Sequence, residues 1–126
     1  IPHYEQALAL EQAHSTLDKA LWRLLVHNLG TAYAMAGDLR HAKITLDYGL
    51  SKDPANVLFH YHLARTYAEM NERDKAMQSL HAAFRTPQHQ DSSEHLPDPR
   101  QDASFRRLML DPTFRHLTES LMQPAI

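Results

Sequence analysis

The chain has 126 residues, of which 43% are hydrophobic and 22% charged, and its formal net charge at neutral pH is −2. This composition is that of a soluble globular chain, and the length suits one domain with a core of its own. A slightly negative charge argues against nucleic-acid binding, which depends on basic surfaces. Cysteine is absent, which excludes disulfides, thiolate catalysis and Cys-based zinc sites. No apolar run approaches the roughly 18 residues of a membrane span. We therefore expect a cytoplasmic protein or, if a signal peptide has been removed, an exported one.

The N-terminal residues have the pattern of an incomplete helix pair. Residues 4–10, YEQALAL, have the apolar spacing of a helix, and Ser15 and Asp18 have the spacing of a capping box at the start of the next helix. We predict that residues 1–20 form a partial leading unit, and that Trp22 anchors one helix against another. A half-unit leaves an apolar face that needs cover, so these residues are also a candidate surface for self-association.

An internal repeat covers the middle of the chain. When residues 23–56 are aligned with residues 57–90, Leu29 matches Leu63 and Ala42 matches Ala76, each 34 positions apart. A fixed period of this size with two helical patterns per unit is typical of a solenoid of helix pairs. Apolar residues recur every three or four positions, which favours helices over strands.

The glycines support this interpretation. Gly30 and Gly49 match Ala64 and Ala83, so each is a small residue that allows two helices to approach closely. Gly37 follows the first helix of its unit, where a left-handed residue ends a helix, and Asp38 can then cap the next helix. Asn71 takes the place of Gly37 in the second unit, and asparagine also tolerates the left-handed conformation.

This pattern resembles the tetratricopeptide repeat family. The positions that carry the resemblance are Leu29, Gly30, Tyr33, Gly37, Ala42, Leu46, Gly49 and Pro54 in the first unit, and Leu63, Ala64, Tyr67, Ala76, Leu80 and Ala83 in the second. Gln88 stands where the family has its closing proline. The resemblance implies an all-α fold, a right-handed superhelical array of antiparallel helix pairs.

The C-terminal third departs from the repeat. Residues 86–101 are polar and rich in proline, and we expect them to form a loop that ends the second unit. Residues 102–122 resume a helical spacing, with Asp111 and Pro112 marking a helix start. Their apolar positions are Phe105, Leu108, Phe114, Leu117 and Leu121. This ending resembles the terminal helices of bacterial tetratricopeptide arrays, and we expect capping helices that cover the last unit within a single domain of residues 1–126.

The family resemblance also implies a binding surface. In tetratricopeptide repeats, the first helix of each unit lines a concave groove that receives a peptide or protein segment. The corresponding positions are Leu24, His27, Asn28, Thr31 and Met35 in the first unit and Leu58, Tyr61, His62, Arg65 and Glu69 in the second. Tyrosine and arginine are typical interface anchors, so Tyr61 and Arg65 are the first candidates for partner contact.

No motif in the chain points to catalysis. The sequence contains no nucleophile elbow, no phosphate-binding glycine loop and no His-Glu-x-x-His pair. The loop residues His89, Asp91, Glu94, His95 and Asp98 have metal-binding side chains, but their spacing matches no known site. We therefore expect a non-enzymatic interaction module without cofactor or metal. Two alternatives stay open: a substrate-recognition or regulatory segment of a larger enzyme or regulator, and a self-associating scaffold.

Overall fold

The computed structural model describes residues 19–85 and 96–122. Within these residues the protein is all-helical and forms no strand, as the apolar spacing predicts. The chain divides into two compact units, residues 1–54 and 55–126. The predictions for the leading unit, including the capping box of Ser15 and Asp18, lie outside the described residues.

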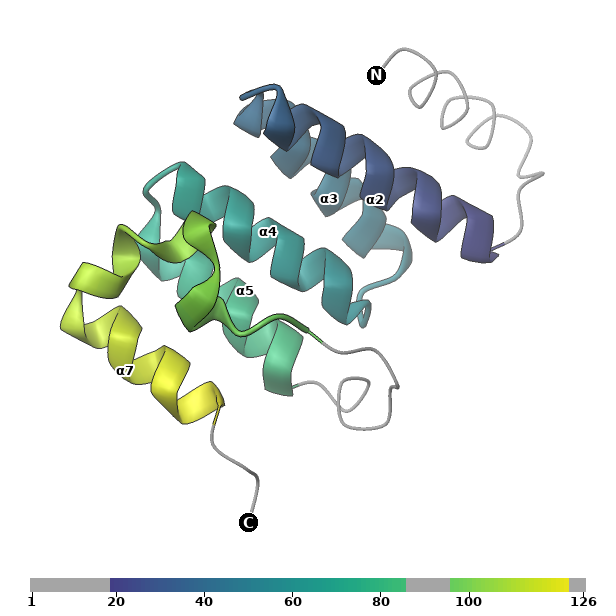
Figure 1. The fold of residues 1–126 in the computed structure, drawn as a ribbon. Helices are drawn as coiled ribbons and strands as arrows, with labels where there is room; N and C mark the ends of the chain where they lie inside the picture. The colour runs from purple at the N-terminus through teal and green to yellow at the C-terminus, as the bar shows by residue number, and fades with distance from the viewer. Residues whose placement is uncertain (1–18, 86–95, 123–126) are drawn as a thin grey trace. The chain divides into compact units, whose positions relative to one another are not determined.

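The first unit contains a hairpin of two helices, α2 (Lys19–Met35) and α3 (Leu39–Lys52) (Figure 1). The large apolar side chains of α2 that are buried lie three or four positions apart and form one stripe: Trp22, Val26, Leu29 and Tyr33. The Trp22 ring meets Tyr48 of α3 edge to face, with ring centroids 6.1 Å apart. Trp22 is therefore an anchor between the two helices, as expected from its position.

The turn between α2 and α3 has the predicted form. Gly37 has a φ of +81°, in the left-handed region. The backbone N–H of Gly37 donates to Ala34, at 3.0 Å, and that of Asp38 donates to Tyr33, at 2.9 Å. The Asp38 carboxylate then accepts the N–H of His41 at 3.2 Å and so caps α3. The backbone conformation at residue 37 favours glycine, and Asp38 starts the next helix.

The second unit begins with a hairpin of the same design, α4 (Val57–Glu69) and α5 (Arg73–Arg85). Asn71 has a φ of +60°. Its N–H donates to Ala68 at 3.0 Å, and the N–H of Glu72 donates to Tyr67 at 2.9 Å. These are the bonds of the α2–α3 turn displaced by 34 positions along the chain. Asn71 adopts the left-handed conformation that was predicted from its alignment with Gly37 in the repeat.

Most positions of the repeat pattern lie in the interior. The buried ones are Leu29, Gly30, Tyr33, Ala42, Leu46, Gly49, Leu63, Ala64, Ala76, Leu80 and Ala83. Tyr67 is half-buried and Pro54 is exposed. The residues of the pattern are therefore mainly core residues, and in each hairpin they come from both helices.

The segment that follows differs from the expected pair of capping helices. Three single turns of 3₁₀-helix, η1 (Pro99–Gln101), η2 (Ala103–Phe105) and η3 (Leu108–Leu110), precede one α-helix, α7 (Pro112–Leu121). The Asp98 carboxylate accepts the N–H of Arg100 and the Asp102 carboxylate accepts that of Ser104, both at 2.9 Å. Such local side-chain bonds compete with a continuous helix, and each of these two starts a separate 3₁₀ turn.

This segment covers the α4–α5 hairpin. Phe105, Leu108, Phe114 and Leu121 are buried in one cluster with residues of α4 and α5, and Leu117 packs against it. The start of α7 is capped as predicted, since the Asp111 carboxylate accepts the N–H of Thr113 at 2.8 Å and Pro112 occupies the first turn. The expected apolar contacts are present although the expected first capping helix is not.

Candidate interaction surface

Tyr61 lies beneath the C-terminal segment rather than on an open surface. Its side chain is fully buried, and its ring packs edge to face on Phe84 and Phe105, with centroids 6.2 and 5.9 Å away. The Tyr61 hydroxyl donates to the Asp102 carboxylate at 2.7 Å. The prediction that Tyr61 is accessible to a partner is therefore wrong, because residues of the same chain occupy the space that the partner was expected to take.

Burial raises the pKa of the Tyr61 hydroxyl well above its usual value, and the bond to the Asp102 carboxylate raises it further. The hydroxyl therefore stays protonated and remains a hydrogen-bond donor. A buried carboxylate needs such donors. The Tyr61–Asp102 contact thus satisfies two polar groups inside the second unit.

Arg65 lies one helical turn after Tyr61 and is also engaged within the chain. Its Nε lies 3.3 Å from the Asp102 carboxylate and 3.3 Å from the Ser104 hydroxyl. The Arg65 side chain is 41% exposed, whereas that of Asp102 is 12% exposed. Arg65 therefore helps to hold η2 on α4, whereas the sequence predicted that it contacts a partner.

The remaining predicted positions of α4 are not covered to the same degree. Leu58 and His62 are half-buried, and Glu69 is exposed. This face of α4 therefore combines charged side chains with Tyr61, which residues of the same chain already cover. Of the two predicted surfaces, it is the less open to a partner.

The corresponding surface of α2 is different. Leu21, Leu24 and Met35 are exposed by 47%, 53% and 84%, which are high values for large apolar side chains. Asn28 and Thr31 lie between them and are half-buried, as is the neighbouring His27. Successive members of this row are three or four residues apart, so they share one side of the helix. We call Leu21, Leu24, Asn28, Thr31 and Met35 the α2 row.

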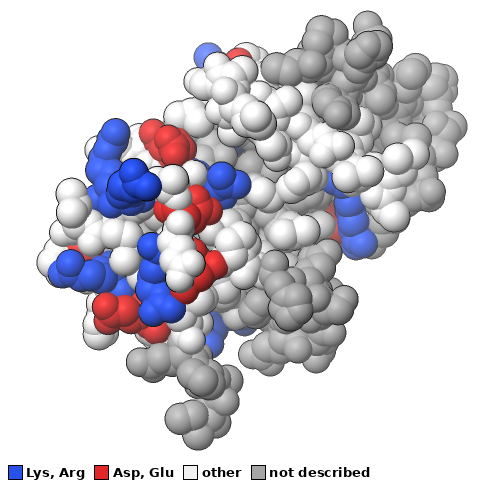
Figure 2. All heavy atoms as spheres, viewed as in Figure 1, with Lys and Arg blue, Asp and Glu red and all other residues white. Residues whose placement is uncertain are grey.

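The α2 row is poor in charge. From Leu24 to Met35 the helix contains no Asp, Glu, Lys or Arg. By contrast, α3 in the same unit carries Arg40, Lys43, Asp47 and Lys52, with Lys43 and Asp47 paired at 2.8 Å. Figure 2 shows blue and red atoms interspersed over the 3₁₀ turns and α7, whereas most of the atoms over α2 in that view are white. Lys19 and Arg23 lie at the start of α2, but Leu24 and Met35 are exposed on the stretch of this helix that has no charged residue.

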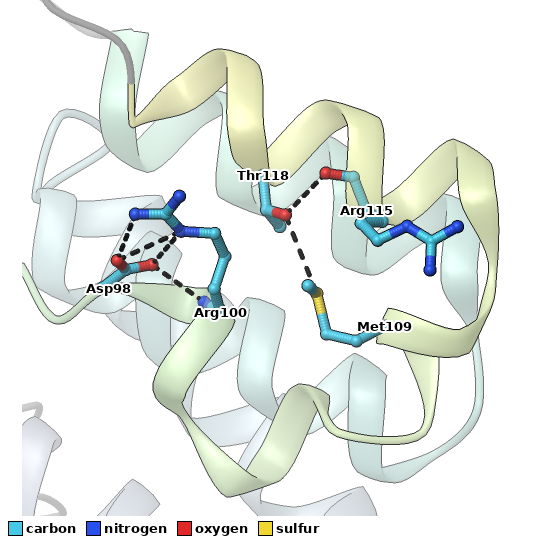
Figure 3. A network of polar contacts seen from close by, with 5 residues as sticks. All are labelled: Asp98, Arg100, Met109, Arg115 and Thr118. Atoms are coloured by element: carbon cyan, nitrogen blue, oxygen red, sulfur yellow. Dashed lines mark hydrogen bonds and ion pairs between the residues drawn. The ribbon is translucent and has the colours of Figure 1, made fainter.

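Polar contacts stabilise the C-terminal segment internally (Figure 3). The Arg100 guanidinium lies 2.7 Å from the Asp98 carboxylate and holds the pKa of that carboxyl below its usual value. The Thr118 hydroxyl donates to the Arg115 carbonyl at 2.8 Å and contacts the Met109 sulfur at 3.7 Å. The second contact joins α7 to η3.

Four of the five loop residues with metal-binding side chains lie outside the described residues: His89, Asp91, Glu94 and His95. The fifth, Asp98, is paired with Arg100. In residues 19–85 and 96–122 no three metal-binding side chains of His, Asp or Glu come together. Among the same residues, no helix has the length and apolar character needed to cross a membrane.

Comparison with known proteins gives no relative. The chain matches no family model, and no curated protein or solved structure is detectably similar to it.

Proposed function

We propose that this protein is a non-enzymatic interaction module that binds a segment of another protein along the α2 row. The resemblance to tetratricopeptide repeats implies binding by the first helix of each helix pair. We place the binding surface on α2 because Tyr61 of α4 is already covered by residues of the same chain. The observation that carries it is the exposure of Leu24 and Met35, at 53% and 84%, on a stretch of helix without charged residues.

Exposed apolar side chains in a continuous row favour association. Each one buried in a complex contributes about 25 cal/mol for every Å² of apolar surface removed from water. The centre of a protein–protein interface is typically depleted of charge and enriched in residues such as methionine. Asn28 and Thr31 supply hydrogen-bonding groups between the apolar anchors, which suits a partner that also offers backbone donors and acceptors.

The test is a pull-down from a lysate of the source organism with the wild-type chain and two single variants. Leu24→Glu places a charge in the α2 row and should abolish capture of the partner. Ile44→Glu is the matched control, since Ile44 is an exposed residue of α3 with nearly the same exposure, 52%. All three chains are first compared by thermal melting to verify that they are folded.

A partner that is lost with Leu24→Glu and kept with Ile44→Glu would support the proposal. Equal capture by both variants would contradict it, because binding would then not depend on the α2 row. The chain's mass is measured at several concentrations in parallel. A mass that rises with concentration in the wild type, but not in Leu24→Glu, would assign the α2 row to self-association instead.

A further inference from the structure

The second unit shows how a segment of chain binds to the first helix of a hairpin of this kind. Residues 102–105 lie on α4, where the Asp102 carboxylate meets Tyr61 and Arg65 at 2.7 and 3.3 Å. The Phe105 ring packs on the Tyr61 ring. Two features therefore hold this segment: a carboxylate on a phenol and a guanidinium, and an aromatic ring against an aromatic ring.

The same positions of α2 have different chemistry. Because the turns of the two hairpins are related by 34 positions, Tyr61 corresponds to His27 and Arg65 corresponds to Thr31. Likewise, Glu69 corresponds to Met35. The cation that binds Asp102 on α4 is thus replaced on α2 by a neutral hydroxyl group.

On this basis we infer that the α2 row selects an uncharged segment with a large apolar or aromatic side chain, and that Thr31 is the position that determines this selectivity. The inference rests on the proposed function and specifies the chemistry of its ligand. An acidic side chain brought to Thr31 would lose part of its hydration and would meet a neutral hydroxyl where α4 has the guanidinium of Arg65, which is unfavourable. An apolar side chain would gain contacts with exposed Leu24 and Met35.

The experiment uses a random peptide library displayed on phage and selected on the full chain. Selections are made on the wild type, on Thr31→Arg, which restores the guanidinium of the α4 site, and on Thr31→Gln, which adds length without charge. Peptides selected on the wild type should contain fewer Asp and Glu residues than the unselected library. Those selected on Thr31→Arg should be enriched in Asp and Glu, and those selected on Thr31→Gln should not.

Individual synthetic peptides then measure the effect. Two labelled peptides that differ only by Asp or Asn are titrated by fluorescence anisotropy. The wild type should prefer the Asn peptide, and Thr31→Arg should shift the ratio of the two affinities toward the Asp peptide by about tenfold, the usual effect of one hydrogen bond to a charged group.

Two outcomes would overturn the inference, and they are distinguishable. Selection of acidic peptides on the wild type would overturn the inferred selectivity but not the proposed function. Selection of the same peptides on Thr31→Arg and Thr31→Gln would have the same consequence. If no selected peptide lost binding to Leu24→Glu, the proposed function would fail and this inference would fail with it.

Discussion

Gly30 of α2 and Leu46 of α3 are in direct contact across the first hairpin. A Cβ atom at residue 30 would lie 3.3 Å from two side-chain carbons of Leu46, which is tight for a carbon–carbon contact. Leu46 is almost completely buried, so it has little room to move away. The absence of a side chain at residue 30 therefore allows α2 and α3 to approach closely, which offsets the cost of about 1 kcal/mol that glycine carries within a helix.

Gly30→Leu should therefore destabilise the protein. The added side chain overfills a packed site, which typically costs about 1–3 kcal/mol. The free energy of unfolding is measured by chemical denaturation. Ala34→Leu is the matched control, because Ala34 is an exposed residue of the same helix and should accept leucine with little change. Equal stability of the two variants would show that α2 and α3 are not closely packed at Gly30.

Gly37→Ala should also destabilise the protein, but for a different reason. No atom would lie within 4 Å of a Cβ at residue 37, whereas its φ of +81° is unfavourable for alanine. The cost is therefore one of backbone conformation, about 1–2 kcal/mol. Thermal and chemical unfolding measure it. Asn71→Gly at the corresponding turn should be neutral or slightly stabilising, and a loss of stability there would contradict this explanation.

The sequence predicts those parts of the fold that depend on neighbouring residues. Gly37 and Asn71 mark the turns, Asp111 caps α7, and the buried stripe of α2 follows the apolar spacing. Each of these features depends on side chains and backbone groups a few positions apart. The short 3₁₀ turns were not predicted, because Phe105 and Leu108 are three residues apart and this spacing suits a 3₁₀-helix as well as an α-helix.

The state of Tyr61 could not be predicted in the same way. The repeat pattern treats His27 and Tyr61 as equivalent, but Tyr61 is covered by Asp102, which lies 41 positions further along the chain, and by Phe105. No local signal joins Asp102 to Tyr61. A segment expected only to cap the last helix pair also crosses α4. The residues that cover Tyr61 are Asp102 and Phe105. Their positions in the sequence do not by themselves predict a contact with α4.

Tyr61→Phe tests whether the contact with Asp102 stabilises the second unit. The change removes one hydroxyl from a buried site and leaves Asp102 with fewer donors, so a loss of about 1–3 kcal/mol is expected. Arg65→Ala should cost less, about 0–1 kcal/mol, because the Arg65 side chain is itself 41% exposed and lies 3.3 Å from the Asp102 carboxylate, farther than the Tyr61 hydroxyl at 2.7 Å. Chemical denaturation distinguishes the two. A larger loss for Arg65→Ala would mean that Arg65, not Tyr61, is the main anchor of η2.

The ion pair between Arg73 and Asp111 should make the stability depend on pH in acid. Arg73 Nη1 lies 2.7 Å from the Asp111 carboxylate. This bond to the guanidinium holds the pKa of Asp111 below its usual value. Because the folded-state pKa is lower than that of the unfolded chain, about 3.9, the contribution of Asp111 to stability is present above that pH. It is lost as the pH falls through the folded-state pKa.

Asp111→Asn should reduce this acid dependence. Asparagine also caps a helix, so the start of α7 should be kept while the titrating group is removed. Chemical denaturation at several pH values between neutrality and about pH 2, below the unfolded-state pKa of an aspartate, measures the slope of stability against pH for both chains. The wild type should lose more stability on acidification than Asp111→Asn. The control is Asp74→Asn, since Asp74 also contacts Arg73, at 3.1 Å, but is 79% exposed. If Asp74→Asn reduced the slope as much as Asp111→Asn, the pH dependence of stability would not be specific to the ion pair between Arg73 and Asp111.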